Sequence, residues 1–308
     1  MNAMNEKTKN STPDLSVIIV TSGREERIRR TIAGLRGQSI RERLEIVIVV
    51  PENGSRGLQG IEADGFLRVV VIEESAGIAR SEARMRGVMN AAAPLTAFIE
   101  DHAYPDEGWA EAVLNAHTRS RAAVGYRILN GNPDKGLSWA NLFLHYGPWV
   151  ERIAPIGDDI LPSENISYQR DILLQYGESL RPFFENDYTL HRDLRRKGYE
   201  LYFEPAARLF HSNVDTLSAT AAYNFSSGRI FATARSYNWS IWQRFVYAGG
   251  FFLIPFIRAP RVYRDIRRTG RIGVVPKIIL PLMIGLASGA FGEMVGYLAR
   301  NGEREPLV

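Results

Sequence analysis

The residues best suited to chemistry follow one apolar run in the first third of the chain. Leu95–Ile99 is followed directly by Glu100, Asp101 and His102. Burying carboxylates and an imidazole is costly unless they are paired or hold a cation. Oxygen and nitrogen ligands of this kind suit a divalent metal, and the imidazole favours Mn²⁺ over Mg²⁺. The triplet alone is also compatible with a capped loop that contains an incidental histidine.

Polar turns also follow the first two apolar runs of the chain. The first run ends at Thr21, and its turn continues through Gly23 and Arg24. A glycine turn that opens a helix presents backbone N–H groups to a phosphate or a base. The second run is followed by Glu52 and Asn53, which could hydrogen-bond a nucleobase or ribose. Both turns are equally compatible with ordinary connections, so neither is specific alone.

The elements that must position these residues alternate regularly. Apolar runs rich in Val and Ile occupy Leu15–Thr21, Leu44–Val50, Leu67–Ile72 and Leu95–Ile99. Such runs are typical of strands covered on both faces, as in a parallel sheet. Helical patterns occupy Arg24–Gly37, Gly77–Ala93 and Asp106–His117. The alternation predicts an open, doubly wound α/β sheet, whose ligands bind at the carboxyl ends of the strands.

The composition indicates a globular protein. The 308 residues are 45% hydrophobic and 23% charged, which excludes a disordered or fibrous chain. The absence of cysteine excludes disulfide scaffolds, thiolate metal sites and cysteine nucleophiles. The net charge is +4, but Arg258–Arg271 holds six arginines and one aspartate, so the remainder sums to 4 − 5 = −1. We therefore expect no broad basic face for nucleic acid.

The motifs together resemble those of a family 2 glycosyltransferase of the GT-A fold. Ser16–Val20 resembles the opening strand of that family, and Gly77–Ser81 approximates its Gly-x-x-x-Ala-Arg-Asn helix. The family's Asp-x-Asp triplet appears as Glu100-Asp101-His102, with Pro and Gly-Trp a few residues on. The resemblance covers roughly Leu15–Asn213 and implies a Rossmann-like, mostly parallel central sheet with helices on both faces. This sequence differs from the family pattern at Arg80-Ser81, where the family has Arg-Asn, and at Glu52-Asn53, where the family has Asp-Asp.

The resemblance implies inverting transfer of a sugar from a nucleotide-diphosphate sugar to an acceptor hydroxyl, with a divalent metal (Mn²⁺ or Mg²⁺). It makes Asp101 and His102 the candidate metal ligands and His211, which ends a later apolar run, the candidate third ligand. Glu100 would contact the ribose or orient the loop. The residues expected to bind the donor are Thr21, Gly23, Arg24, Glu52, Asn53, Arg80, Glu100 and Asn165.

The resemblance also implies a catalytic base. The family places it in a Glu-Asp dipeptide that opens a helix about eleven residues before a glycine. Counting back from Gly198 gives Asp187, with Asn186 in place of the family's glutamate. The pattern predicts a helix over Asn186–Lys197. Asp187 could instead only stabilise the positive end of that helix.

The remaining histidines and several aromatic residues have other interpretations. His117 and His145 are expected to be structural, and His191 is expected to be solvated on the helix that Asp187 begins. Trp139, Tyr146 and Trp149 lie in a segment that reads as rich in loops. They could stack on a sugar ring, although aromatic side chains more often belong to the core.

The carboxyl-terminal third contains two apolar segments. Phe245–Ile257 has no charge, and Ile278–Leu298 is a run of 21 residues whose only charge is Glu293. A bilayer span needs about 20 apolar residues, and the arginines between the segments favour an anionic cytoplasmic surface. The segments could lie on, re-enter or span the membrane, or form a soluble helical subdomain. We expect a tail over residues 1–14, a catalytic domain over 15–216 and a membrane-associated helical region over 217–308.

The leading interpretation is therefore a metal-dependent glycosyltransferase at the cytoplasmic membrane face, acting on a lipid-linked or cell-surface glycan precursor. One alternative is a nucleotidyltransferase, against which the chain lacks a basic glycine-rich triphosphate fingerprint. The other is a nucleotide-sugar-binding protein that keeps the fold and has lost catalysis.

Overall fold

A computed structural model of the chain describes residues 12–22, 25–58, 60, 65–75, 77–152 and 161–299. These residues fall into two compact units. The first takes the described residues up to Arg127 and those from Leu161 to Phe210, and the second takes Ile128–Arg152 and His211 onward. The carboxyl-terminal helices thus share a unit with the segment that follows the sixth strand.

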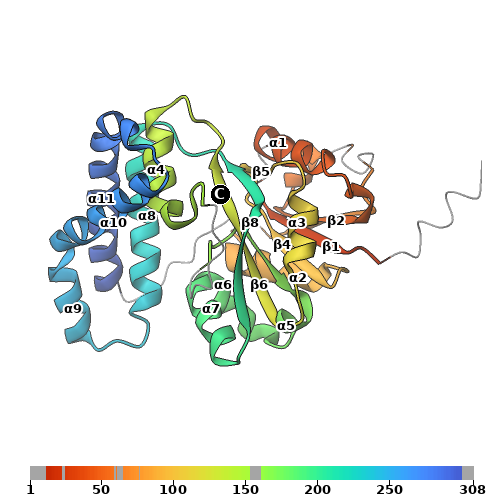
Figure 1. Ribbon diagram of the computed structural model, residues 1–308. Helices are drawn as coiled ribbons and strands as arrows, with labels where there is room; N and C mark the ends of the chain where they lie inside the picture. Colours follow the sequence, from red (N-terminus) through yellow and green to blue (C-terminus); the bar gives the residue numbers. More distant parts are fainter. Residues whose placement is uncertain are drawn as a thin grey trace, which may run out of the picture. The chain divides into compact units, whose positions relative to one another are not determined.

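The amino-terminal half of the first unit is the parallel part of a sheet (Figure 1). Its strands are β1 (Leu15–Val20), β2 (Leu44–Pro51), β3 (Arg68–Glu74) and β4 (Leu95–Phe98). β1 pairs in parallel with both β2 and β4, so that Val17 lies opposite Ile46 on one side and Ala97 on the other. The four predicted strands and their parallel order are confirmed, and β1 and β2 are buried along nearly their whole length.

β3 departs from the expectation of strands covered on both faces. Arg68 and Glu73 are exposed and the rest of the strand is half-buried. The reason is its place at one end of the strand order, β3-β2-β1-β4-β7-β6-β8-β5. An edge strand has one neighbour and tolerates charged side chains there.

The rest of the sheet is mixed. β7 (Ile166–Gln169) pairs antiparallel with β4 and with β6 (Arg121–Asn130). β8 (Glu200–His211) and the short β5 (Ala103–Pro105) complete the order. β6 and β8 are long strands, with 10 and 12 residues.

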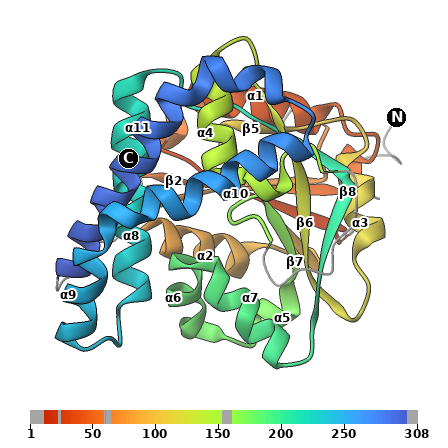
Figure 2. The same cartoon turned by 60° about the vertical axis from the view of Figure 1, so that its left-hand side comes forward.

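The helices of the first unit include those predicted after the early strands: α1 (Glu25–Arg36), α2 (Arg80–Asn90) and α3 (Trp109–Ala116). Three more follow, α5 (Arg170–Leu174), α6 (Leu180–Glu185) and α7 (Asp187–Arg196). α2 approaches β1 closely at Gly87, where a Cβ atom would lie 2.4 Å from Ile18 Cγ2. Figure 2 shows α2 beside α6 and α7. The predicted helix over Asn186–Lys197 is confirmed, with the Asn186 side chain accepting a hydrogen bond from Tyr188 N.

The second unit is helical. It contains α4 (Gly136–Tyr146), α8 (Leu217–Arg235), α9 (Ile241–Gly249), α10 (Ile254–Arg268) and α11 (Val275–Leu298), with short 3-10 turns between them. Trp139 and Tyr146 lie on α4 and not in a loop, and both are buried. The Trp139 ring stacks on Phe143 and its Nε1 donates to Pro133 O over 2.8 Å. Their role is therefore packing, which favours the core interpretation over sugar stacking.

Glycines bring α8 and α11 into close contact. A Cβ atom on Gly292 would lie 2.0 Å from Phe225 O, and one on Gly228 would lie 2.1 Å from Gly289 O. Within the described residues, one helix, Ile272–Leu298, is long and apolar enough to cross a membrane, with a mean hydropathy of 1.8. α9 and the segment Phe251–Arg268 pass the same test only together, across a bend of 44°.

Candidate functional site

The triplet Glu100-Asp101-His102 occupies the turn between β4 and β5. The β-strand ends at Phe98, and Glu100 and Asp101 are both buried, with 8% of each exposed. Ala103 N donates to Glu100 O, which closes the turn. Thr31 on α1 fixes it from another side, because its hydroxyl lies 3.0 Å from Asp101 O and 2.7 Å from Ala103 O. The triplet is thus held at the carboxyl end of a parallel strand, where α/β sheets bind ligands.

Both carboxylate oxygens of Asp101 are hydrogen-bonded inside the protein. Thr21 Oγ1 donates to Oδ2 over 2.7 Å, and His102 Nδ1 lies 2.9 Å from Oδ1. Burial opposes ionisation of Asp101, but the bonds from His102 and Thr21 outweigh it and hold the pKa of Asp101 below its usual value. Asp101 therefore acts on the imidazole of His102 and fixes its orientation.

The other nitrogen of His102 faces Glu100. His102 Nε2 lies 3.7 Å from Glu100 Oε1. Burial disfavours the charged imidazole, but Glu100 and Asp101 outweigh it and raise the pKa of His102. A positive charge is therefore stabilised at this position, and a bound cation would satisfy the same field that favours the proton.

Asn165 brackets Glu100 with both ends of its amide. Its Oδ1 accepts from Glu100 N over 3.2 Å, and its Nδ2 donates to Glu100 Oε2. Asn165 is fully buried at the start of β7, the antiparallel neighbour of β4. The second Glu100 oxygen is thereby fixed, and Oε1 is the one that faces His102.

Asp187 pairs with a residue that the sequence analysis did not single out. Arg84 Nη1 lies 3.0 Å from Asp187 Oδ2, and the Arg84 guanidinium also stacks over the rings of Phe98 and Phe184. Burial raises the pKa of Asp187, although Arg84 opposes the shift. The available signal for Arg84 was its position one helical turn after Arg80, next to the apolar residues Met85 and Val88.

Arg80 and Arg84 line one small cavity of about 10 Å³ in the first unit, together with Phe98, Glu100 and Glu164. Arg80 Nη1 lies 2.7 Å from Glu164 Oε2. A space of this size holds about one water molecule, so it is not itself a substrate pocket. It does place the two arginines, the first carboxylate of the triplet and Glu164 around a single polar space.

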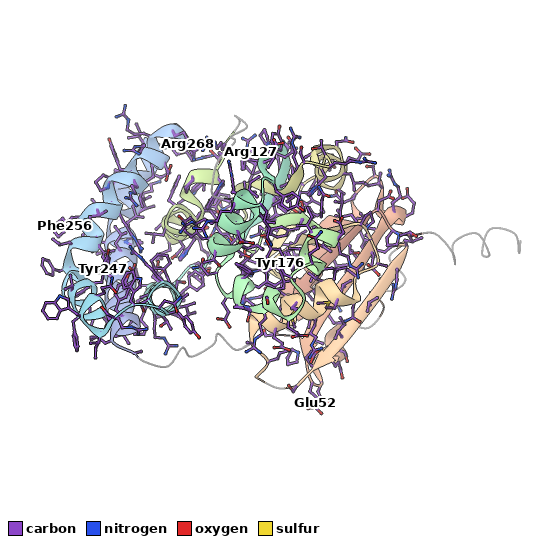
Figure 3. The ribbon with its side chains drawn as sticks, turned by 90° about the horizontal axis from the view of Figure 1, so that it is seen from below. Glu52, Arg127, Tyr176, Tyr247, Phe256 and Arg268 are labelled. Carbon is purple, nitrogen blue, oxygen red and sulfur yellow. The ribbon has the colours of Figure 1, made fainter. Side chains whose placement is uncertain are left out.

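The other residues predicted to bind the sugar donor lie away from the triplet or outside the residues that the structure describes. Glu52 and Asn53 are exposed in the turn after β2, where Asn53 adopts a φ of 65°. Glu52 projects outward (Figure 3). Neither side chain hydrogen-bonds to the triplet within the described residues. Gly23 and Arg24 lie outside the described residues.

His211 is the last residue of β8 and belongs to the second unit. Its side chain is buried, and Nδ1 lies 2.8 Å from Asn213 Oδ1. The ring also packs against Tyr146, with the two ring centres 4.8 Å apart. An imidazole held through Nδ1 in this way has a fixed orientation.

The expectation for His191 is wrong. Its side chain is fully buried, and Nε2 lies 3.0 Å from Tyr168 OH. The helix turns this position toward the sheet because Leu190 and Leu194 occupy the same buried face. Burial lowers the pKa of His191 to about 3. His117 is structural, as expected: Nε2 lies 2.8 Å from Ser167 Oγ, and burial lowers its pKa to about 4.

A parallel half-sheet with a carboxylate and imidazole cluster at its strand ends, followed by antiparallel strands, defines a GT-A fold. The family model for glycosyl transferase family 2 matches residues 16–176, which is 161 of the 308 residues. The chain therefore belongs to glycosyl transferase family 2.

Two solved structures share this fold at low sequence identity. A mannosyltransferase from Pyrobaculum calidifontis, PcManGT in complex with GDP-Man and Mn²⁺, matches with a TM-score of 0.56 and 12% identity over 94% of this chain and 86% of its own. GalNAc-T7 with UDP, GalNAc and Mn²⁺ matches with a TM-score of 0.50 and 14% identity over 66% of this chain. The match covers 44% of the GalNAc-T7 chain. No curated protein matches the sequence.

Proposed function

We propose that this protein transfers a sugar, with inversion, from a nucleotide-diphosphate sugar to an acceptor hydroxyl with the help of a divalent cation. Family membership supports glycosyl transfer. The proposal of a metal-dependent reaction with a nucleotide-sugar donor rests on the cluster of side chains at the end of β4. There Glu100, Asp101 and His102 are fixed by Thr21 and Asn165. The two similar structures contain Mn²⁺ with a sugar nucleotide, or with a nucleotide and a sugar, which agrees with it.

The metal ligands proposed within the first unit are Glu100 and His102, with Glu100 taking the place of the Asp101 that the resemblance implies. Glu100 Oε1 and His102 Nε2 lie 3.7 Å apart, a spacing that allows both atoms to bind one cation. Asp101 is proposed to act through His102, because a carboxylate bonded to the far nitrogen of a ligand histidine orients the ring and raises its basicity. His211 is proposed as the third ligand, with its ring oriented by Asn213. A divalent cation bound there would neutralise the charge of the departing diphosphate.

Thr21, Arg80 and Asn165 are proposed to act around the donor. Thr21 and Asn165 hold the triplet from opposite sides. Arg80 carries a positive charge to the small polar cavity beside Glu100 and would exchange Glu164 for a phosphate oxygen of the donor. Gly23, Arg24, Glu52 and Asn53 remain proposed contacts of the base, ribose or phosphate.

Asp187 is the proposed general base, which accepts the proton of the acceptor hydroxyl as that oxygen attacks the anomeric carbon. Its pKa is raised by burial, which strengthens a carboxylate as a base. Its Oδ2 is bonded to Arg84, so the acceptor would have to reach the other oxygen or displace the guanidinium. Catalytic contacts often form only when substrate is bound.

The acceptor is proposed to be a lipid-linked or cell-surface glycan precursor at the cytoplasmic face of the membrane. Support comes from the apolar helix over Ile272–Leu298 and the bent pair before it. We propose residues 15–216 as the catalytic domain and residues 217–308 as the membrane-associated region. The tail expected over residues 1–14 lies almost entirely outside the residues that the structure describes.

The test is a thermal-shift screen of nucleotide diphosphates and their sugars, each with and without Mn²⁺. The matching nucleotide should raise the midpoint of unfolding only with metal, and His102→Ala should abolish this Mn²⁺-dependent rise. Asp187→Asn should lower transfer by about 100-fold or more while nucleotide binding is kept. Stabilisation by no nucleotide diphosphate would refute the proposal, and binding without hydrolysis or transfer by the wild-type protein would identify a binding protein that has lost catalysis.

A further inference from the structure

The surface formed by α9, α10 and the turn between them is unusually apolar for a protein surface. Trp242 on α9 and Phe256 on α10 are each 74% exposed, and Phe252, in the turn between them, is 58% exposed. The other large apolar side chains exposed along this stretch are Ile241, Phe245, Val246, Leu253 and Ile257. In Figure 3 the Phe256 side chain projects outward from α10. Large apolar side chains exposed in this number on two consecutive helices and the turn between them indicate a partner.

Arginines divide into two groups along α10 and the turn after it. Arg258, Arg268 and Arg271 are used inside the second unit: they bond the Glu293 carboxylate, Gly147 O and the Glu151 carboxylate, respectively. Arg261, Arg264 and Arg267 recur every third residue and are exposed. None of these three makes a salt bridge or hydrogen bond with any other residue that the structure describes. α10 therefore presents apolar side chains at its start and unpaired cationic ones beyond.

This order of side chains matches the depth profile of a lipid monolayer. Apolar and aromatic side chains insert to the acyl boundary, and arginines meet the phosphates above it. A groove of about 400 Å³ opens on the same unit and is lined by Trp239, Ile241, Arg244, Phe245, Tyr297 and Leu298. It combines aromatic walls with one cationic side chain, which suits the upper part of an acyl chain.

The packing of α11 opposes a simple crossing by that helix. Its glycine face is in backbone contact with α8, which carries Asn224, Arg229 and Arg235. Glu293 on α11 is 2% exposed and bonds Arg258 on α10 over 2.6 Å. If α11 crossed the bilayer, its bonded neighbours would have to enter it too, and charged groups in hydrocarbon are costly.

We infer that the second unit lies in the plane of an anionic phospholipid surface, with α9, the Phe251–Leu253 turn and α10 inserted in one leaflet, and that α11 does not cross the bilayer. The inference rests on the membrane attachment under the proposed function and names its partner and its mode. The arginines would recognise the phosphate headgroups, and the apolar side chains would recognise the acyl layer beneath them.

The first experiment measures binding of the full-length protein to sedimenting vesicles of phosphatidylcholine alone or with 30% phosphatidylglycerol. Replacing Arg261, Arg264 and Arg267 by Gln should lower the partition coefficient on the anionic vesicles by about 100-fold, because each arginine contributes a factor of about five. Replacing Trp242, Phe252 and Phe256 by Ser should weaken binding to both vesicle types. The control changes Arg119, Arg192 and Arg196 to Gln, which removes the same charge from exposed positions of the first unit. Equal loss in the control, or no lipid preference in the wild type, overturns the inference.

The second experiment uses the absence of cysteine in the chain. Single cysteines replace Ile272 and Leu298, which are exposed at the two ends of the α11 region. In spheroplasts, a membrane-impermeant maleimide should label neither position before lysis and both after it. Labelling of only one position in intact cells shows that α11 crosses and overturns the inference. A soluble dimer that breaks on replacing Trp242 and Phe256, with vesicle binding unchanged, would assign the face to a second copy.

Nucleotide binding tests the proposed transfer reaction separately from vesicle binding. Nucleotide-dependent thermal shifts should be the same in the arginine variant and in the wild type, because none of the three arginines belongs to the metal cluster. If the wild-type protein binds nucleotide but not vesicles, only the surface assignment is refuted, and if it binds vesicles but no nucleotide, only the transferase is refuted.

Discussion

Arg84 and Asp187 form a buried ion pair between α2 and the first residue of α7, with Arg84 Nη1 and Asp187 Oδ2 3.0 Å apart and 3% of each side chain exposed. Residues 103 positions apart in the sequence are joined by this bond. The proposed base is thus attached to the helix that packs on β1, and the guanidinium contacts the rings of both Phe98 and Phe184. The position of Asp187 depends on this contact.

Replacing Arg84 by Met should destabilise the fold by about 3–5 kcal/mol, because it leaves a buried carboxylate without its countercharge. Adding Asp187→Asn should recover part of that loss, because it removes the unpaired charge. Both values come from urea unfolding at pH 7. The control is Arg43→Met, whose partner Asp14 and own side chain are largely exposed and which should cost less than about 1 kcal/mol. Additive losses in the double variant would contradict the coupling.

Replacing Asn165 by Ala should weaken Mn²⁺ binding by about 10–100-fold, the usual effect of losing a group that orients a metal ligand. The substitution frees Glu100 from both amide contacts. Calorimetric titration with Mn²⁺ gives the affinity. Asn90→Ala is the control, because Asn90 is an exposed residue that bonds Arg86 O within α2. An unchanged affinity in a folded Asn165 variant would separate Glu100 from the metal site.

Replacing Gly292 by Ala should destabilise the second unit by about 1–3 kcal/mol, the usual cost of overpacking, because the new Cβ would lie 2.0 Å from Phe225 O. α8 and α11 would have to separate, which outweighs the higher helix propensity of alanine. The measurement is the rate of limited proteolysis and the unfolding midpoint of the full chain. Gly249→Ala, where a Cβ would meet nothing within 4 Å, should change neither appreciably. A neutral Gly292 variant would show that the helices are not in backbone contact.

Acid should destabilise the first unit through His191. Its pKa is lowered to about 3 by burial, whereas the unfolded chain has a value near 6.5, so the unfolded state binds more protons below pH 6.5. The stability associated with the neutral ring is complete above about pH 6.5 and falls as the pH drops toward 3, by about 2 kcal/mol at pH 5. Urea unfolding at pH 7 and pH 5 measures the loss. His191→Phe should lose less stability between these pH values than the wild type, and an equal loss would show that His191 is not the responsible group.

The sequence predicted the parallel half of the sheet well because the information there is local. β1 and β2 are continuous runs of branched apolar residues, and runs of that kind are buried on both faces wherever they fold. The same reasoning failed at β3, because a strand's place at the sheet edge is decided by neighbours that its own residues do not specify. It also failed at His191, where a polar-looking helix turned one histidine inward.

Within the candidate site, the sequence placed Glu100, Asp101 and His102 at a strand end but did not resolve their roles. Three adjacent side chains can point in different directions, and the contacts of Thr21 and Asn165 decide which oxygen each carboxylate presents. Arg84 went unrecognised because its partner lies on another helix, and a buried ion pair leaves no spacing pattern in the chain.

The chain by itself determined the α/β alternation, the family resemblance, the late apolar segments and the strand end where polar groups gather, since each of these depends on residues close together in sequence. Tertiary structure decided which of those groups touch, that Arg84 holds Asp187, and which apolar side chains of α9 and α10 remain exposed. The reason is physical: burial and pairing depend on distances between segments up to 121 residues apart, and only the folded chain sets those distances.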